Sequence, residues 1–196
     1  MTKMIFKPWI GPNFERTGFE GLRVLILGES HYGEPGTEYD NFTSDVVREW
    51  AFGKPSAFFS KIAKSMLRLT SQQNLSDDQR AQFWSSVAFY NYVQKLVGDG
   101  PRQRPSPDLW EQSKQAFFEA LNQLNPDVCV VFGMELWSNL PSPKQNLTTD
   151  SYQTYVYTTD NGKKVFAGCV THPASKLIYA EAHPRIEALI KLAKTG

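Results

Sequence analysis

The sequence predicts an α/β fold, in which a mostly parallel sheet carries helices on both faces. Two observations lead to this prediction. Short apolar runs, each long enough for a buried strand, recur along the chain. Between them lie longer segments whose apolar residues repeat at helical spacing. Alternation of these two kinds of segment is typical of parallel sheets covered by helices. No repeat or low-complexity tract interrupts it, so we expect a single domain over residues 1–196.

The predicted strands are short and are bounded by polar or glycine-containing segments. They cover residues 23–27, 86–90, 127–132, 152–158 and 163–170. The last two flank Asp160-Asn161-Gly162, a turn sequence typical of a β-hairpin, so this pair is the exception to the strand–helix alternation.

The predicted helices begin after capping residues and end near helix-breaking residues. They cover about 43–51, 57–70, 77–84, 106–124 and 180–194. Ser56 is a plausible N-cap, and Pro126 stops the long helix before it. The helix after Ser56 also carries Lys61, Lys64 and Arg68 along one side, which we interpret as a solvated face. Residues 98–107 and 141–146 are proline-containing loops.

Composition limits the function classes without choosing among them. The formal net charge is +1, so any surface for a charged partner has to be local. Cys129 and Cys169 each lie in an apolar run, and their spacing fits neither a metal site nor a disulfide framework. The first residues lack the apolar stretch of a signal peptide, and no segment is long and apolar enough to span a membrane. We therefore expect a cytoplasmic protein without metal, iron–sulfur cluster or other cofactor.

Polar side chains follow the ends of several predicted strands. The first strand runs into GESHYG (28–33), the second ends at Asn91, the third ends at Gly133, and the last leads into Thr171, His172 and Pro173. In parallel sheets, ligands bind outside the carboxyl ends of the strands. The sequence therefore predicts a functional site at this edge of the sheet.

Four motifs in order give the chain a resemblance to a known family. They are GESHYG, VAFYNYVQKLVGDGPRQRPSP, LNQLNPDVCVVFG and THPAS, which together span roughly residues 22–190. In this order they resemble the uracil-DNA glycosylase superfamily. The resemblance implies a three-layer α/β/α sandwich around a mostly parallel, four-stranded sheet. It also implies a monomeric, monofunctional DNA glycosylase that hydrolyses the N-glycosidic bond of uracil or a modified pyrimidine and leaves an abasic site.

The resemblance also assigns catalytic and base-reading roles. Asn91 would bind the edge of a flipped base, and His172 would donate a hydrogen bond to the base oxygen as the bond breaks. Glu29 would position water or stabilise the sugar cation. Ser30 stands where the best-known branch of the family has an aspartate, so we include it with the catalytic residues. The structural alternatives are a turn-capping Asn91, a packed His172, and a Glu29 that binds loop amides.

Four further residues are expected to form the base pocket. Gly28, His31 and Tyr32 belong to the first motif, although relatives commonly have proline where this chain has His31. Phe58 is expected to stack on the base, with ordinary core packing as the alternative.

The expected DNA contacts lie in short loops that carry basic, hydroxyl or proline residues. They are Arg102, Arg104, Lys144, Ser175, Lys176 and, as an apolar wedge, Leu177. The alternative for each of them is an ordinary surface loop.

Two other functions stay open at the level of sequence. GES after the first strand resembles the Gly-Asp-Ser block of small esterases, in which Ser30 would be the nucleophile and a late histidine the base. A protein of the same fold that binds nucleic acid without cleaving it is the other. The sequence does not name the base, nor does it distinguish DNA repair from defence against modified phage DNA.

Overall fold

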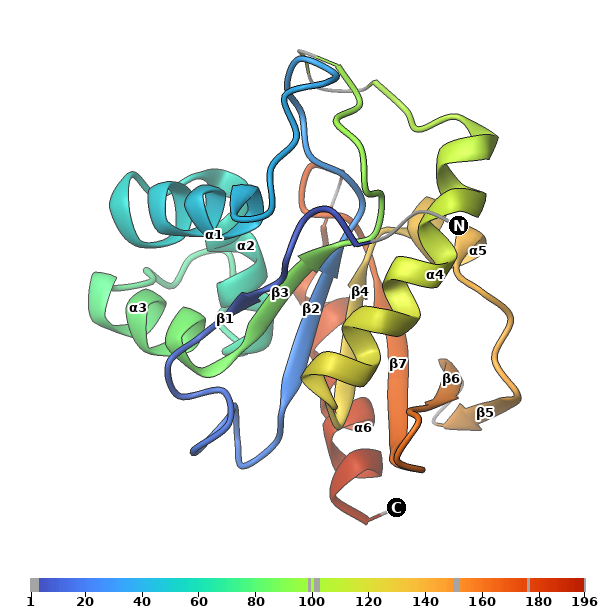
Figure 1. Cartoon of the computed structure of the whole chain (residues 1–196). Helices are drawn as coiled ribbons and strands as arrows, with labels where there is room; N and C mark the ends of the chain where they lie inside the picture. The colour runs from blue at the N-terminus through green and yellow to red at the C-terminus, as the bar shows by residue number, and fades with distance from the viewer. Residues whose placement is uncertain (1–3, 99, 101–102, 150–151, 176, 196) are drawn as a thin grey trace.

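The protein has an α/β fold built on one mixed sheet, seen in Figure 1. The computed structural model describes residues 4–98, 100, 103–149, 152–175 and 177–195. Within these residues the sheet has seven strands in the order β1-β3-β2-β4-β7-β6-β5. The strands are β1 (Trp9–Ile10), β2 (Val24–Gly28), β3 (Ala88–Asn91), β4 (Val128–Phe132), β5 (Gln145–Thr149), β6 (Tyr152–Thr158) and β7 (Lys164–Val170).

The centre of the sheet is parallel, as predicted, but the sheet is wider than the four strands expected. β3, β2, β4 and β7 pair in parallel with one another. Antiparallel β1 is added beside β3, and antiparallel β6 and β5 are added beside β7. The four-stranded sheet that the resemblance implied was too small: β6 corresponds to the strand predicted over 152–158, but β1 and β5 were not predicted. β1 is only two residues long, and β5 begins in a segment whose prolines indicated a loop.

The five predicted helices are all present, although α2 ends at Met66 and not near residue 70, and the structure adds two helical features. The helices are α1 (Phe42–Val47), α2 (Ala57–Met66), α3 (Asp77–Ser86), α4 (Pro107–Leu124), α5 (Met134–Asn139) and α6 (Tyr179–Thr195). α1 continues as a π-helix, η1 (Arg48–Gly53), and the short α5 was not predicted. Ser56 and Ser106 cap α2 and α4 by accepting hydrogen bonds from backbone amides, as their positions in the sequence suggested.

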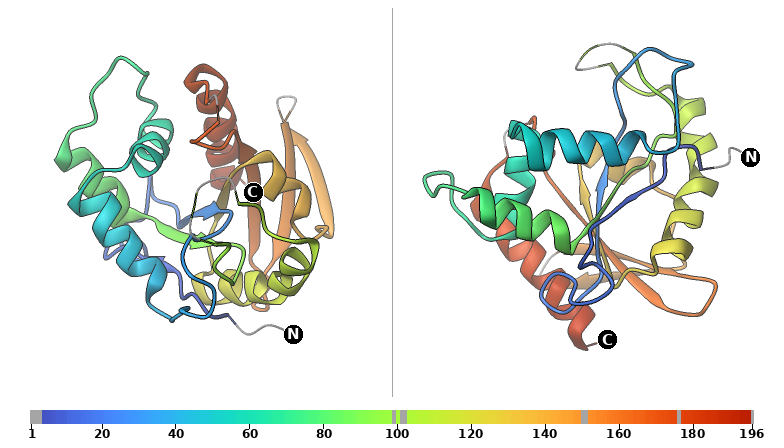
Figure 2. Two further views of the ribbon diagram at one scale, coloured as in Figure 1. Left: turned by 90° about the horizontal axis from the view of Figure 1, so that it is seen from above. Right: turned by 60° about the vertical axis from the view of Figure 1, so that its left-hand side comes forward.

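Helices cover both faces of the sheet, and the alternation of side chains along β2 shows how. Val24 and Ile26 face a core that is completed by α1, η1, α2, α3 and α6. Leu25 and Leu27 face the opposite core, which is completed by α4 and α5. Figure 2 shows the sheet between these two sets of helices. Because β2 is buried on both faces, its sequence is continuously apolar.

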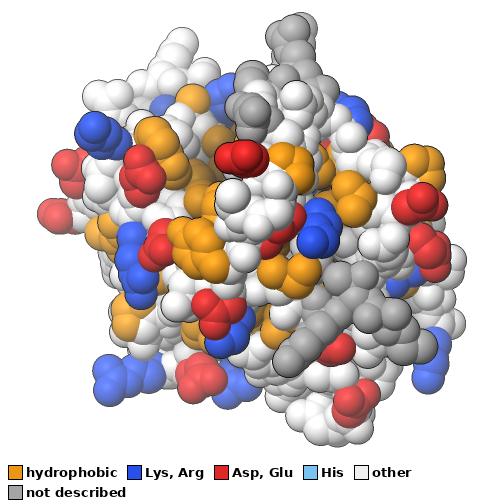
Figure 3. Space-filling view, turned by 45° about the horizontal axis from the view of Figure 1, so that its top comes forward, with side chains coloured by type: hydrophobic (Ala, Val, Ile, Leu, Met, Phe, Trp, Pro, Cys, Tyr) orange, Lys and Arg blue, Asp and Glu red, His pale blue; other side chains and the backbone are white. Residues whose placement is uncertain are grey.

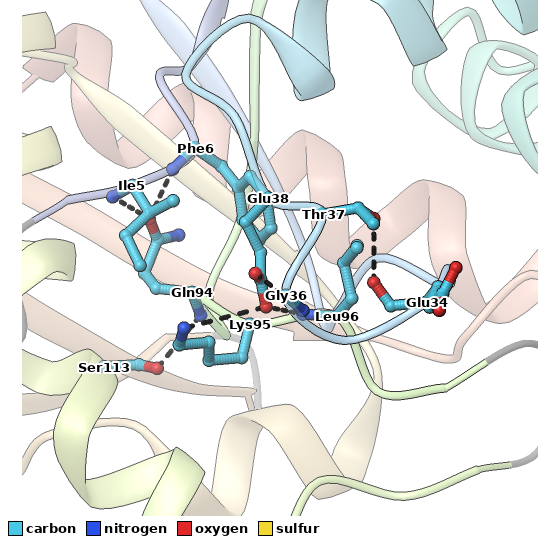
Figure 4. Close-up of polar contacts among 10 residues, drawn as sticks. All are labelled: Ile5, Phe6, Glu34, Gly36, Thr37, Glu38, Gln94, Lys95, Leu96 and Ser113. Atoms are coloured by element: carbon cyan, nitrogen blue, oxygen red, sulfur yellow. Dashed lines mark hydrogen bonds and ion pairs between the residues drawn. The ribbon is translucent and has the colours of Figure 1, made fainter.

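The chain segments that follow β2 and β3 are fastened to each other above the sheet. The Glu29 and His31 carbonyls accept hydrogen bonds from the amides of Val93 and Val97, at 2.9 and 3.1 Å. The Glu38 carboxylate accepts from the amides of Leu96 and Gly36, as Figure 4 shows. The loop that contains the first motif is thus held in place along much of its length.

Gln94 ties the N-terminal segment to the same place. Its side-chain oxygen accepts hydrogen bonds from the backbone amides of Ile5 and Phe6, both at 2.9 Å, and its backbone N–H donates to the Ser113 hydroxyl (Figure 4). Along the described ranges, no helix combines the length and the apolar character needed to cross a membrane.

Candidate functional site

A pocket of about 1450 Å³ opens at the carboxyl ends of the parallel strands. It collects side chains from the loop after β2, the end of β3, helices α1, η1 and α2, the segment before α4, the start of α5, and the loop after β7. The predicted site residues that line it are Glu29, Ser30, His31, Tyr32, Phe58, Asn91, Arg104, His172 and Ser175. Residues far apart in the sequence therefore meet in one cavity.

The other predicted site residues lie elsewhere. Lys144 is exposed in the connection between α5 and β5, away from the pocket lining. Leu177 is partly buried and packs against the core that the sheet forms with α1, η1, α2, α3 and α6, so it does not stand free as a wedge in this structure. Arg102 and Lys176 lie outside the described residues.

Asn91 and Gly28 face each other at the ends of two parallel strands. They are register partners in the pairing of β2 with β3, and the Asn91 side chain is buried. A Cβ atom at Gly28 would overlap the Asn91 side-chain oxygen and lie 3.3 Å from the Phe89 ring. Glycine at this position therefore makes the space in which the Asn91 amide lies. Gly28 supports the pocket from below and does not line it.

The His172 ring is held in one tautomer. Its Nδ1 accepts a hydrogen bond from the Ala174 amide at 3.1 Å, so the proton of the neutral ring is on Nε2. Burial lowers the pKa of His172, and the positive charges of Arg104 and Lys61 lower it further. The ring lies 5.5 Å from the Phe58 ring. His172 thus offers the pocket a neutral hydrogen-bond donor.

Glu29 shares one guanidinium with a second carboxylate. Arg104 Nη1 lies 3.1 Å from both Glu29 carboxylate oxygens and 3.0 Å from Glu135 Oε2. Burial raises the pKa of Glu29, the Arg104 charge opposes that rise, and the nearby Glu135 charge adds to it. Arg104, which we expected to contact DNA, is therefore engaged inside the pocket.

His31 is a packed histidine at the pocket wall. Its Nε2 lies 2.9 Å from the Thr43 hydroxyl, and its ring packs between Phe6 and Phe42 at centroid distances of 5.1 and 5.0 Å. Burial lowers the pKa of His31 to about 3. The ring is thus neutral at any physiological pH, and it can contribute shape and one polar edge but not a charge.

Sequence reasoning missed several residues of the pocket. They are Phe42, Val46, Glu49, Trp50 and Glu135, which come from α1, η1 and the start of α5. The available clue was Met134, a large apolar residue directly after the glycine that ends a predicted strand. The π-helical turn of η1 has no comparable sequence pattern, although such turns are frequent at functional sites.

The basic stripe predicted for the helix after Ser56 is not simply solvated, which corrects the expectation; Lys61 and Lys64 lie on α2, but Arg68 lies beyond its end at Met66. Lys61 Nζ donates a hydrogen bond to the Pro173 carbonyl at 2.8 Å, and so ties α2 to the loop that carries His172. Arg68 pairs with Glu20 instead of facing solvent. Lys64 reaches the Ser71 carbonyl at 3.2 Å and, of the three, is the one that fits the original interpretation best.

Comparison with known proteins adds no family to this description. No protein-family model matches the chain, and a search among curated proteins finds no similar sequence. The functional argument therefore depends on the pocket itself. Within the described part of the chain, no group of three or more His, Cys, Asp and Glu side chains is placed to hold a metal ion.

Proposed function

We propose that the protein is a DNA glycosylase that hydrolyses the N-glycosidic bond of a pyrimidine flipped out of DNA. The observation that carries the proposal is the meeting of three groups in one pocket: the buried Asn91 amide, the Glu29 carboxylate, and His172 held as a neutral donor. They come from the ends of three different parallel strands, where ligands of such sheets bind.

Asn91 supplies the recognition of the base. A carboxamide both donates and accepts hydrogen bonds, which suits the polar edge of a pyrimidine. The Asn91 amide is buried and positioned over Gly28, so a base that failed to match it would leave a buried polar group unpaired.

Glu29 and His172 supply the chemistry. Water adds to the sugar carbon while the bond from that carbon to the base nitrogen breaks, and the electron pair leaves with the base. His172 Nε2–H donates to the base oxygen on which negative charge develops. The Glu29 carboxylate stabilises the cationic sugar and accepts a proton from the attacking water. The products are the free base and an abasic site.

The size and walls of the pocket favour a modified pyrimidine over plain uracil. Its volume of about 1450 Å³ exceeds the roughly 300–1000 Å³ typical of pockets for drug-sized ligands. The part formed by η1 presents the Glu49 carboxylate and the Trp50 ring, and Tyr32 lies half-exposed at the mouth. A substituent on the base would find both stacking surface and hydrogen-bond acceptors there.

The esterase alternative is supported less well. A histidine that activates Ser30 needs an unprotonated nitrogen facing the hydroxyl, with its other nitrogen donating to an orienting group. His172 has the opposite arrangement, because its Nδ1 accepts from a backbone amide. In this tautomer the ring donates through its other nitrogen and does not act as a base.

The test is a base-release assay with EDTA present. The panel holds DNAs with uracil, hypoxanthine, thymine mismatches and 5-substituted cytosines, single- and double-stranded, and alkali reveals abasic sites. We expect release from a pyrimidine substrate and a loss of about 10²-fold or more in His172→Ala. The control is His183→Ala, in a histidine of α6 that does not line the pocket, and it should keep the wild-type rate. Asn91→Ala should lose discrimination between bases, and Ser30→Ala should keep most activity.

Three outcomes would overturn the proposal. DNA binding without release of any base would favour the non-catalytic alternative. Ester hydrolysis that is abolished by Ser30→Ala would favour the esterase. Base release that is unaffected by His172→Ala would remove the proposed leaving-group contact.

A further inference from the structure

Arg104 occupies a special position between two acidic side chains from different elements. Glu29 follows β2, and Glu135 lies in the first turn of α5. All the contacts described for the guanidinium run through Nη1, at 3.0–3.1 Å, to these two carboxylates. On the molecular face shown in Figure 3, hydrophobic side chains lie near the centre, with acidic and basic side chains between and around them.

The backbone next to Arg104 is fixed by the sequence. Pro105 follows it and is buried, and a residue before proline is restricted to extended conformations. Ser106 then caps α4, its hydroxyl accepting from the Leu109 amide. The guanidinium therefore reaches Glu29 from an anchored position, even though 60% of the Arg104 side chain is exposed.

We propose that Arg104 is a positioning residue, which aims the Glu29 carboxylate into the pocket and keeps it ionised, and that Glu135 holds Arg104 in that place. The inference rests on the proposed function, in which Glu29 must be a carboxylate during the reaction. Only 9% of the Glu29 side chain is exposed, and a carboxylate buried to this extent favours its neutral form unless a cation lies beside it.

The charge of the Arg104 guanidinium affects the pKa of both Glu29 and His172 in the direction that the proposed reaction needs. Its positive charge opposes protonation of Glu29 and also lowers the pKa of His172. One cation thus favours an ionised acid and a neutral histidine together, which is the pair that the proposed reaction needs. Lys61, on α2, acts on His172 in the same sense.

The other groups near Glu29 act differently. Glu135, on α5, opposes ionisation of Glu29 through its negative charge while it anchors Arg104. Glu49, on η1, lines the same pocket, and His31, two residues along the loop from Glu29, stays neutral. Arg104 is therefore the group whose removal should change Glu29 most.

The experiment measures the ionisation of Glu29 directly, by NMR titration of its ¹³C-labelled carboxyl, beside the pH dependence of base release. In Arg104→Gln we expect the pKa of Glu29 to rise by about 1 unit, with the acid limb of the rate profile shifted by the same amount. Arg104→Lys should restore much of the shift because it keeps the charge. In Glu135→Gln the amide oxygen can still accept a hydrogen bond from Arg104 and hold it in place, while the negative charge is lost, so the pKa of Glu29 should fall.

The control is Arg48→Gln, which removes an exposed arginine of η1 that pairs with Asp45 and does not line the pocket. It should leave the pKa of Glu29 unchanged. An Arg104→Gln protein that folds and shows the wild-type pKa of Glu29 overturns the inference, whether or not the wild type releases a base. The expected shifts in a protein that releases no base would support the role of Arg104 and refute the proposed function instead.

Discussion

Replacing Gly28 with alanine is the sharpest test of how the pocket is built. The added methyl would overlap the Asn91 side-chain oxygen and come within 3.3 Å of the Phe89 ring. Gly28 lies in the strand β2, and its backbone is not in the left-handed region. The cost of the substitution therefore comes from crowding of side chains and not from backbone strain.

The magnitude follows from what has to move. An extra methyl in a packed interior typically destabilises a protein by about 1–3 kcal/mol. For a chain of 196 residues this corresponds to a fall in Tm of about 2–12 °C. If Asn91 turns aside to relieve the overlap, the loss of stability will lie near the lower value. In that case the amide leaves its place, and base discrimination is lost instead.

The assay therefore measures urea unfolding and base release on the same proteins. Gly53→Ala is the control, because its added methyl would lie 3.4 Å from the Arg48 carbonyl, an ordinary contact. In Gly28→Ala/Asn91→Ala the main overlap is gone, so the alanine at position 28 should cost less than it does alone. A Gly28→Ala protein with wild-type stability and wild-type base discrimination would refute the reasoning.

Two other predictions concern His31 in the pocket wall and the hydrogen bond from Lys61 to the loop that carries His172. His31 has a pKa of about 3 when folded and about 6.5 when unfolded, so its contribution to stability is complete above pH 6.5 and is lost as the pH falls toward 3. Between pH 7.5 and pH 5 we expect the free energy of unfolding, measured in urea, to fall by about 2 kcal/mol because of His31. This fall should be absent from His31→Gln, and an equal pH dependence in both proteins would contradict the prediction. Lys61→Met removes the 2.8 Å hydrogen bond to Pro173 and should cost about 0.5–1.5 kcal/mol and slow base release, whereas Lys64→Met on the same helix, which loses only the exposed 3.2 Å bond to the Ser71 carbonyl, should cost less and leave base release unchanged. Equal effects of the two lysine substitutions would show that the tie to the His172 loop is unimportant.

Much of the fold could be predicted from sequence because its central strands are buried on both faces. A short continuous apolar run such as 128–132 is typical of a strand that is buried on both faces. Ser56 and Ser106 mark helix starts because their hydroxyls accept hydrogen bonds from backbone amides. The grouping of Glu29, Asn91 and His172 could also be predicted, because parallel strands deliver their carboxyl ends to one edge.

The remaining features depend on contacts that leave no local pattern. β1 exists because two residues pair with the edge of β3, and η1 is shaped by the core on which it packs. The ion pair between Arg104 and Glu29 joins residues 75 positions apart, and neither position alone indicates it. In the same way, Lys61 looks like a solvated helix residue until the loop after β7 is placed beside it.

The charges of the pocket favour a base inside it and disfavour a phosphate. Among the described residues that line it, the acidic side chains are Glu29, Glu49 and Glu135, and the one lysine or arginine is Arg104, already shared by two of them. A phosphate moved into this cavity would meet excess negative charge in partly apolar surroundings, where charge repulsion is screened least. Under the proposed function, a neutral base would meet no such penalty and would gain the Asn91 amide and the His172 donor. The DNA backbone should therefore stay at the rim, and binding energy from the pocket should depend little on salt, unlike contacts made by surface lysines and arginines.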